Sequence, residues 1–366
     1  MVSTRFVVPV AACLVLAGCA GGTTTSDGSE STEGGSEAIT PLESSSTSAD
    51  ASITGEPPSI VSVLNGPLGD DAFFDDVEQG LHTLADQGWE TKTVEAPLND
   101  PVSWKANLEA ASNGDYDLVV VGTIQMADIL QTVAPAHPNQ HYVIWDMVVD
   151  APNVTSITYA QNEGSYLAGV LAAKASQDTT AFPKSEGNNR VGIVAGMESP
   201  VIDDFIGGFK AGVASVSPDM PVDVAYVGSF TDANAGAQQA KAMYDQGVDV
   251  IYAIAGGASL GVAHAAKEAD DYAIGVDLNM NPVEPGFVLA SMVKQIGRSI
   301  SDTSNGLKDG TVQPGTVQVI GLDAGLGLTY EGNNDAVPDT VKKELDQTAT
   351  DIIDGKITVP SALNGQ

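Results

Sequence analysis

Polar and aromatic residues stand at the ends of several apolar, strand-length runs in this 366-residue sequence. The residues at these run ends are Asn65, Asp146, Phe230, Gly256, Asp277 and Lys294. Carboxylate, ammonium and amide groups can hold the polar edge of a small molecule, and an aromatic ring can stack on a flat one. Each residue alone also has an ordinary structural explanation, such as a cap or turn for an aspartate. Their shared placement at run ends is what indicates a binding site.

The elements that must position these residues alternate along the chain. The runs expected as strands are SIVSVLN, DLVVVGT, YVIWDMVV, RVGIVAG, VDVAYVGS, VDVIYAIAG and YAIGVDL, and those expected as helices are DDVEQGLHTLADQG, SWKANLEAASNG, FIGGFKAGVASV, AGAQQAKAMYDQG and LGVAHAAKEA. Near-continuous apolar runs are typical of strands buried on both faces of a parallel sheet. The repeated order of strand, loop and helix predicts an α/β fold, whose ligands bind beyond the carboxyl ends of the strands.

Enzyme and metal motifs are incomplete. The glycine-rich turn AGGASLG lacks the Gly-Lys-Ser/Thr of a phosphate-binding loop. Ser259 fits Gly-x-Ser-x-Gly, but the only later histidine, His264, falls in the same expected helix and cannot complete a triad. His137 and His141 are four residues apart with a proline between them, which breaks the helix that would align them on a metal. We therefore expect no catalytic residues, no metal and no cofactor.

The amino-terminal residues predict export and a lipid anchor. Arg5 precedes the apolar stretch Phe6–Leu16, which is too short to cross a bilayer as a permanent helix and is typical of a secretory signal. Two small residues then precede Cys19, as in a bacterial lipobox, where the cysteine thiol receives a lipid after cleavage. The alternative is an ordinary signal peptide with an incidental cysteine. Cys13 leaves with the signal, so we expect no disulfide in the mature chain.

The segment after Cys19 has the composition of a tether. Residues 20–57 carry seven Asp or Glu, no Lys or Arg and no aromatic residue. Such a segment cannot bury enough apolar area to offset the entropy of ordering it, so we expect a flexible, self-repelling leash. The formal net charge of the whole chain is -33, which argues against binding nucleic acid because phosphates would be repelled.

Five segments together resemble the basic membrane protein family, purine-nucleoside receptor-like lipoproteins that serve ABC importers. The segments are Ile157–Gly169, Gly196–Gly212, Val227–Val262, Ile274–Asp277 and Ser291–Lys294. The resemblance covers Pro58 to about Gly355 in order, and it implies a type I periplasmic-binding-protein fold. That fold has two doubly wound lobes with parallel sheets, joined by a three-segment hinge, which close over a ligand.

The chain accordingly divides into four parts. The parts are a lipoprotein signal peptide (1–18), the lipidated cysteine and tether (19–57), a first lobe (58–160 plus 292–324) and a second lobe (161–291 plus 325–366).

Carried over position by position, the resemblance gives first-lobe residues roles at the base. Asn65 and Asp146 would face the edge of a purine, and Phe73 or Phe74 would stack on its ring. The sequence departs from the family pattern here, since Leu64 replaces an acid and Phe74 stands where an asparagine is usual. A different nucleoside, or another ring-bearing ligand, is therefore the alternative to a purine nucleoside.

The resemblance gives second-lobe residues roles at the other ring face and the sugar. Phe230 would stack on the opposite face of the ring, and the Gly256 backbone would hydrogen-bond the sugar or base. Asp277 would hold the ribose hydroxyls together with Lys294 at the hinge. The segment VDLNMN replaces the family's usual residues just after that aspartate.

The expected function is that of a lipid-anchored solute-binding protein at the extracytoplasmic face of the cell membrane. It would bind a nucleoside and deliver it to the permease and ATPase of an ABC importer, as a monomer that touches the membrane only through its lipid. Two other classes compete with this reading. One is a ligand sensor for a membrane receptor, and the other is a secreted nucleoside-processing enzyme on a similar fold.

Overall fold

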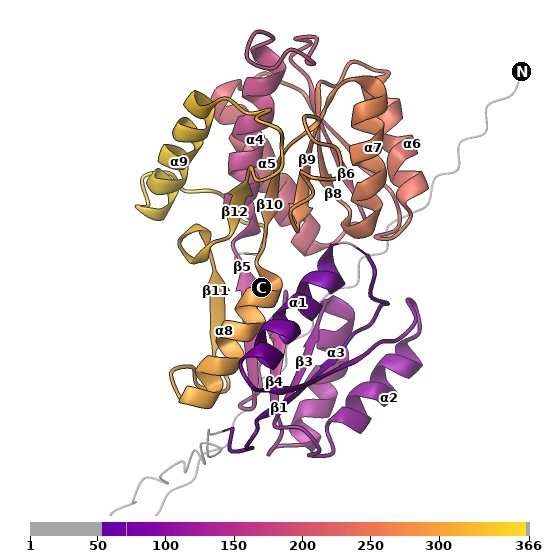
Figure 1. The fold of residues 1–366 in the computed structure, drawn as a ribbon, viewed down its shortest axis with the longest axis vertical. Coiled ribbons are helices and arrows are strands. Elements are labelled where there is room, and N and C mark those ends of the chain that lie inside the picture. The colour runs from indigo at the N-terminus through magenta and orange to yellow at the C-terminus, as the bar shows by residue number, and fades with distance from the viewer. Residues whose placement is uncertain (1–52, 71, 364–366) are drawn as a thin grey trace, which may run out of the picture. The chain divides into compact units, whose positions relative to one another are not determined.

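The computed structural model describes residues 53–70 and 72–363, whose fold is shown in Figure 1. The predicted signal peptide, Cys19 and most of the predicted tether lie outside these residues. The prediction of a tether is wrong for residues 53–57, because Ile53 is buried in the core and Gly55 N–H donates to Asp117 Oδ1 at 3.2 Å. The described strands form two six-stranded sheets, each the centre of an α/β lobe. Within the described residues, no helix has both the length and the apolar character needed to cross a membrane.

The first sheet has the strand order β11-β5-β4-β3-β1-β2, and its neighbouring strands all run parallel. Its strands are β1 Ser59–Val63, β2 Glu90–Val94, β3 Leu118–Gly122, β4 His141–Trp145, β5 Val154–Tyr159 and β11 Val317–Ile320. Its helices are α1 Phe73–Asp86, α2 Pro101–Ala111, α3 Ile124–Val133 and α8 Ile296–Asp309, with a 3-10 turn η1 at Ala134–Ala136. Val61 and Val63 share an apolar cluster with α2 and α3, whereas Ile60 belongs to the cluster that contains α1. Helices therefore cover both faces of the sheet, as its apolar strands require.

The second sheet has the strand order β12-β10-β9-β8-β6-β7 and is parallel except for β12, which runs antiparallel to β10. Its strands are β6 Val191–Ala195, β7 Val222–Tyr226, β8 Val250–Ile254, β9 Tyr272–Asp277, β10 Val288–Val293 and β12 Gly327–Thr329. Its helices are α4 Gln161–Gln177, α5 Pro200–Val216, α6 Ala233–Tyr244, α7 Ser259–Ala269 and α9 Asp339–Ile353, with 3-10 turns η2 at Gly256–Ala258 and η3 at Leu322–Ala324. Ile251 packs with α6 and α7, and its neighbour Tyr252 packs with α4 and α5. This sheet is thus also covered on both faces.

The chain passes between the two sheets three times. The crossings lie between β5 and α4, between β10 and α8, and between β11 and β12. β10 stays in the second sheet as far as Val293, so the crossing that follows it falls at Lys294 and Gln295, slightly beyond the boundary expected at 292. α8 then packs on α1, beside which it lies in Figure 1. A Cβ on Gly80 would lie 2.3 Å from the Gly297 oxygen, so this approach requires glycine.

Helix ends follow the expected glycine signals. Gly88 and Gly247 come shortly after α1 and α6 with φ of 93° and 81°. That left-handed conformation costs glycine little and satisfies the last carbonyl groups of a helix.

The predicted two-lobed α/β architecture with three crossings is confirmed.

Candidate ligand-binding site

The candidate residues lie at the carboxyl ends of the strands in both sheets. Asp146 directly follows β4, Asp277 is the last residue of β9, and Lys294 directly follows β10. Asp146 and Asp277 have positive φ angles of 66° and 65°. This conformation is uncommon outside glycine and is best tolerated by Asn and Asp, so each strand leaves its sheet with a turn at an aspartate.

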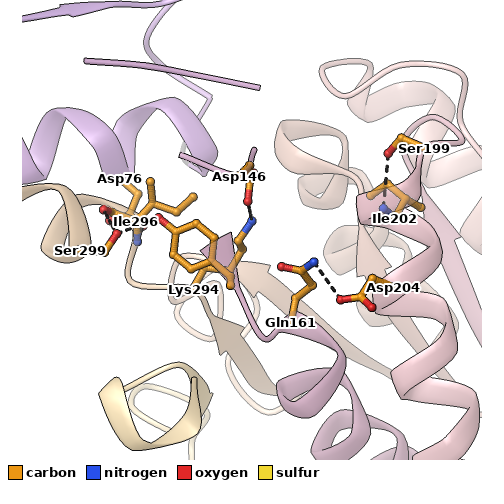
Figure 2. Close-up of polar contacts among 10 residues, drawn as sticks. Asp76, Asp146, Gln161, Ser199, Ile202, Asp204, Lys294, Ile296 and Ser299 are labelled. Atoms are coloured by element: carbon orange, nitrogen blue, oxygen red, sulfur yellow. Dashed lines mark hydrogen bonds and ion pairs between the residues drawn. The ribbon is translucent and has the colours of Figure 1, made fainter. Parts of the chain in front are cut away.

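Lys294 connects the lobes. Its side chain is buried, with 1% of the residue exposed, and its Nζ donates a hydrogen bond to Asp146 Oδ1 of the first lobe (Figure 2). The ammonium lies 4.5 Å from the ring centroid of Tyr159 and 5.6 Å from that of Phe205. Aromatic faces attract a cation, so these rings stabilise the ammonium inside the protein. A buried ion pair therefore spans the two lobes at a hinge crossing.

The carboxylate of Asp277 is buried beside this pair, and the backbone carbonyl of the residue accepts a hydrogen bond from Lys294 N–H at 3.2 Å. The residue is 7% exposed, and no hydrogen bond joins its carboxylate to another described residue. Burial raises the pKa of Asp277 to about 7; Lys294 works against this shift, and Asp146 adds to it. The Lys294 ammonium thus acts on the Asp277 carboxylate through charge, while its hydrogen bond goes to Asp146.

Asp76 on α1 belongs to the same group of charges, although no feature of the sequence singled it out. Its carboxylate accepts hydrogen bonds from the backbone N–H groups of Ile296 (2.8 Å) and Gly297 (3.2 Å), the first residues of α8. Burial raises the pKa of Asp76 to about 6, and these bonds act in the opposite direction. Acids are common in the first turn of a helix, so an aspartate at this position does not by itself indicate a binding site.

The two candidate phenylalanines of the first lobe differ in burial. Phe74 is 8% exposed and packs in the core, where a Cβ on Gly66 would lie 2.4 Å from its ring. Phe73 is only partly buried, and its ring centroid lies 6.2 Å from that of Trp145. Of the two, Phe73 is the better placed to meet a ligand.

Phe230 and the glycine turn after β8 form the corresponding part of the second lobe. The Phe230 ring is partly buried over Gly196, and its carbonyl accepts a hydrogen bond from Ala258 N–H at 3.2 Å. Gly256 has φ of 54°, and a Cβ there would lie 3.0 Å from the Phe230 oxygen. A Cβ on Gly257 would lie 3.2 Å from the Asp70 oxygen, so the two lobes touch at this turn.

Three buried polar atoms near these strand ends lack a hydrogen-bond partner among the described residues. They are Asn65 Oδ1, Trp145 Nε1 and Gln161 Oε1. Asn65 Nδ2 donates to Thr123 Oγ1 at 3.0 Å, and Gln161 Nε2 donates to Asp204 Oδ2 at 2.9 Å (Figure 2). Buried polar atoms are normally paired, so unpaired ones mark places for water or a ligand. Sequence analysis pointed to Asn65 and missed Trp145 and Gln161, because a tryptophan inside an apolar run and a glutamine at a helix start are both ordinary.

Two cavities are lined by other residues. One of about 160 Å³ is next to the crossing after β10 and is lined by Gln295 and by residues of α8, β11 and η3, including Arg298 and Gln318. The other, of about 430 Å³, is lined by residues 55–58 and Lys308. Within the described part of the chain, no group of three or more His, Cys, Asp or Glu side chains could hold a metal ion.

Comparisons with known proteins identify relatives of this chain. The Bmp family model, described as ABC transporter substrate-binding protein PnrA-like, matches residues 58–362. The chain is 37% identical over 282 residues to the ABC transporter nucleoside-binding protein BmpA of Lactococcus lactis subsp. cremoris, which is 72% of this chain and 76% of that one. It is 29% identical over 323 residues to basic membrane protein A1 of Borrelia garinii subsp. bavariensis, which is 86% of this chain and 92% of that one.

Solved structures show the same fold. A crystal structure of an ABC transporter solute-binding protein from Aeropyrum pernix K1 has a TM-score of 0.73 and 25% identity, and the likeness covers 83% of this chain and 94% of that one. The predicted type I periplasmic-binding-protein fold is confirmed. The resemblance to the basic membrane protein family is confirmed as well: the family model is described as a substrate-binding protein, and the relative from Lactococcus lactis is named as a binding protein. The chain belongs to the Bmp family of PnrA-like ABC transporter substrate-binding proteins.

Proposed function

We propose that this substrate-binding protein captures a nucleoside, with a purine as its base, between the two lobes and delivers it to an ABC permease. The observation that carries the proposal is the buried charge group at the lobe boundary. There, the carboxylate of Asp277 in the second lobe lies beside the Lys294–Asp146 pair without a hydrogen bond to another described residue. The relative from Lactococcus lactis is named as nucleoside-binding, which supports the same ligand class.

The chemistry of a nucleoside suits these side chains. Its ribose presents a cis-diol, and a carboxylate such as that of Asp277 can accept both hydroxyl protons in charge-assisted hydrogen bonds. Its base presents two flat faces, which Phe73 and Phe230 would cover from opposite lobes. Stacking on an aromatic side chain stabilises a bound base by roughly 1–3 kcal/mol.

Binding at a lobe boundary also explains how capture is signalled to a permease. Each lobe alone supplies only part of the contacts, so a ligand that touches both stabilises the closed arrangement. The permease then meets a protein whose lobes are closed only when loaded. We expect the protein to work as a monomer and to perform no chemistry on the ligand.

The amino-terminal segment supports a place outside the cytoplasm. We infer that Cys19 carries the lipid and that the segment from residue 20 to about residue 52 acts as a passive tether at the outer face of the membrane. Replacement Cys19→Ser should release the protein into the medium without changing its ligand affinity. A Cys19→Ser protein that stays with the membrane fraction would contradict the anchor.

A thermal-shift screen of the purified chain tests the ligand class. Inosine, guanosine, adenosine and a pyrimidine nucleoside are compared with the free bases and with ribose. A ligand at 100 times its dissociation constant stabilises the folded protein by about 2.7 kcal/mol, which is readily seen as a higher melting temperature. Purine nucleosides should give the largest shift. A shift with ribose or a free base but none with any nucleoside would overturn the proposal.

A further inference from the structure

The charges around Asp277 do not balance. Its carboxylate shares the lobe boundary with three other carboxylates and one ammonium: Asp70, Asp76, Asp146 and Lys294. The ammonium is hydrogen-bonded to Asp146 and lies against the ring of Tyr159. Asp76 is hydrogen-bonded to the start of α8, and Asp70 accepts backbone N–H bonds from Phe74 (3.0 Å) and Asp75 (3.2 Å). Asp277 is the carboxylate of this group without such donors.

The charged and titratable groups that interact with Asp277 are three acids, one cation and two neutral phenols. The first lobe supplies Asp146 after β4, Asp76 on α1, Asp70 before α1 and Tyr159 on β5. The second lobe supplies Lys294 after β10 and Tyr252 on β8. Burial keeps the pKa of both tyrosines above the ordinary value, so their phenols stay neutral. With one cation already paired, an ionised Asp277 has no full compensation here.

A buried carboxylate without donors is stabilised in one of two ways. It can take up a proton and become neutral, or it can receive hydrogen bonds that favour its charged form. The protein supplies no such donors among the described residues. A vicinal diol would supply two.

We propose that the hydroxyl groups of the ligand bind Asp277 in exchange for a proton, so that nucleoside capture releases a proton near neutral pH. This inference rests on the proposed function, because the diol is that of the bound nucleoside. In the exchange, the neutral carboxyl of the free protein loses its proton to the buffer. The resulting carboxylate then accepts two O–H···O hydrogen bonds, and no covalent bond of the ligand changes.

The direction of the pH dependence follows from this exchange. The ligand binds the ionised form of Asp277, and the pKa of about 7 in the free protein means that this form becomes scarce as the pH falls. Affinity should therefore fall by about tenfold between pH of about 8 and about 6, and binding near the lower value should release close to one proton. A ligand that instead bound the neutral carboxyl would lose affinity as the pH rises.

Calorimetry measures the released proton directly. Inosine is titrated into the purified chain at pH of about 6.5 in two buffers whose ionisation enthalpies differ. The dependence of the observed heat on the buffer gives the number of protons released. The Asp277→Asn variant, whose side chain tolerates the same positive φ, should bind inosine more weakly and show no buffer dependence.

The matched control is Asp271, which directly precedes the same strand, about 20 Å from Asp277 by the rise of a strand. Burial raises the pKa of Asp271 to about 7 as well. The acids that add to this shift are Asp249, Glu186 and Asp270, none of which belongs to the charge group at the lobe boundary. Asp271→Asn should leave both the affinity for inosine and the released proton unchanged. If Asp271→Asn abolishes proton release while Asp277→Asn keeps it, the assignment to Asp277 is wrong.

The failures of the two proposals are distinguishable. Inosine could bind with the same affinity from pH of about 6 to about 8, and its heat of binding could be independent of the buffer. That result overturns the proton exchange but not the proposed nucleoside function. Absence of binding for every nucleoside at every pH overturns the proposed function itself.

Discussion

Two buried aspartates of the second lobe lie at opposite ends of the strands in its sheet. Asp249 directly precedes β8 at the amino edge, and Asp277 ends β9 at the carboxyl edge. Asp249 is fully buried and accepts hydrogen bonds from the Ser176 hydroxyl, from Glu186 N–H at 3.1 Å and from Asn188 Nδ2 at 3.3 Å. The carboxylate of Asp277 has no hydrogen bond to another described residue.

The contrast separates a structural carboxylate from one prepared for a ligand. The donors around Asp249 come from the end of α4 and from the loop before β6, so they hold these segments together. No described residue donates to the Asp277 carboxylate, and we propose that the ligand supplies these donors. A protein keeps a buried charge without donors only where the charge serves a purpose, because burial without compensation destabilises the fold.

The largest expected effect is that of removing the cation from the carboxyl edge. Lys294→Met leaves Asp146 and Asp277 buried without their counter-charge, and breaking a buried pair in this way costs about 3–5 kcal/mol of folding free energy. Inosine binding should be lost as well. Urea unfolding at two pH values checks this, with a smaller loss expected at low pH, where the Asp277 carboxyl is protonated. Lys241→Met, which removes an exposed pair with Asp245, serves as the control and should change little.

Amide substitutions at the two aspartates should have opposite effects on stability. Asp249→Asn loses at least one charged hydrogen bond and should destabilise the fold by roughly 1.5–3 kcal/mol. The folded pKa of Asp277 is raised from 3.8 to about 7, so its carboxyl lowers stability progressively as the pH rises between those values. Asp277→Asn removes that penalty and should be more stable than wild type at pH of about 8, with little difference at pH of about 4. Destabilisation by both variants at the higher pH would remove the distinction between the two edges.

The smallest effect concerns the aromatic contact rather than the charges. Phe230→Ala should weaken inosine binding by roughly 1–3 kcal/mol, the contribution of one stacked ring, with a small loss of stability because the side chain is partly buried. The matched core residue is Phe209, which is fully buried and stacks on Tyr252 with 5.2 Å between the ring centroids. Phe209→Ala should cost roughly 3–5 kcal/mol of stability. Affinity and melting temperature are measured together, and a large stability loss at Phe230 with intact binding would place that ring in the core.

The architecture was readable from the sequence because its signals are local. Strands such as β3 and β8 are buried along their whole length, and this appears as an unbroken apolar run. β2 was not anticipated, since its sequence ETKTV is polar and the strand lies at the edge of its sheet, where one side needs no partner. β11 at the opposite edge, with two exposed valines, was also missed.

The charge group at the lobe boundary was readable only in part. Asp277 and Lys294 stood out because they end apolar runs and match a family pattern. Asp76 did not, because its role depends on α8, more than 200 residues later in the chain, packing on α1. The pairing of Lys294 with Asp146 likewise depends on how the hinge brings the two lobes together, and no spacing in the sequence encodes that contact.

A crystal structure of the chain with inosine tests the central claim most directly. The account predicts the nucleoside at the lobe boundary, with both ribose hydroxyls within hydrogen-bond distance of the Asp277 carboxylate and the base between Phe73 and Phe230. Inosine bound elsewhere, for example in the cavity beside Arg298, or with its ribose turned away from Asp277, would contradict it.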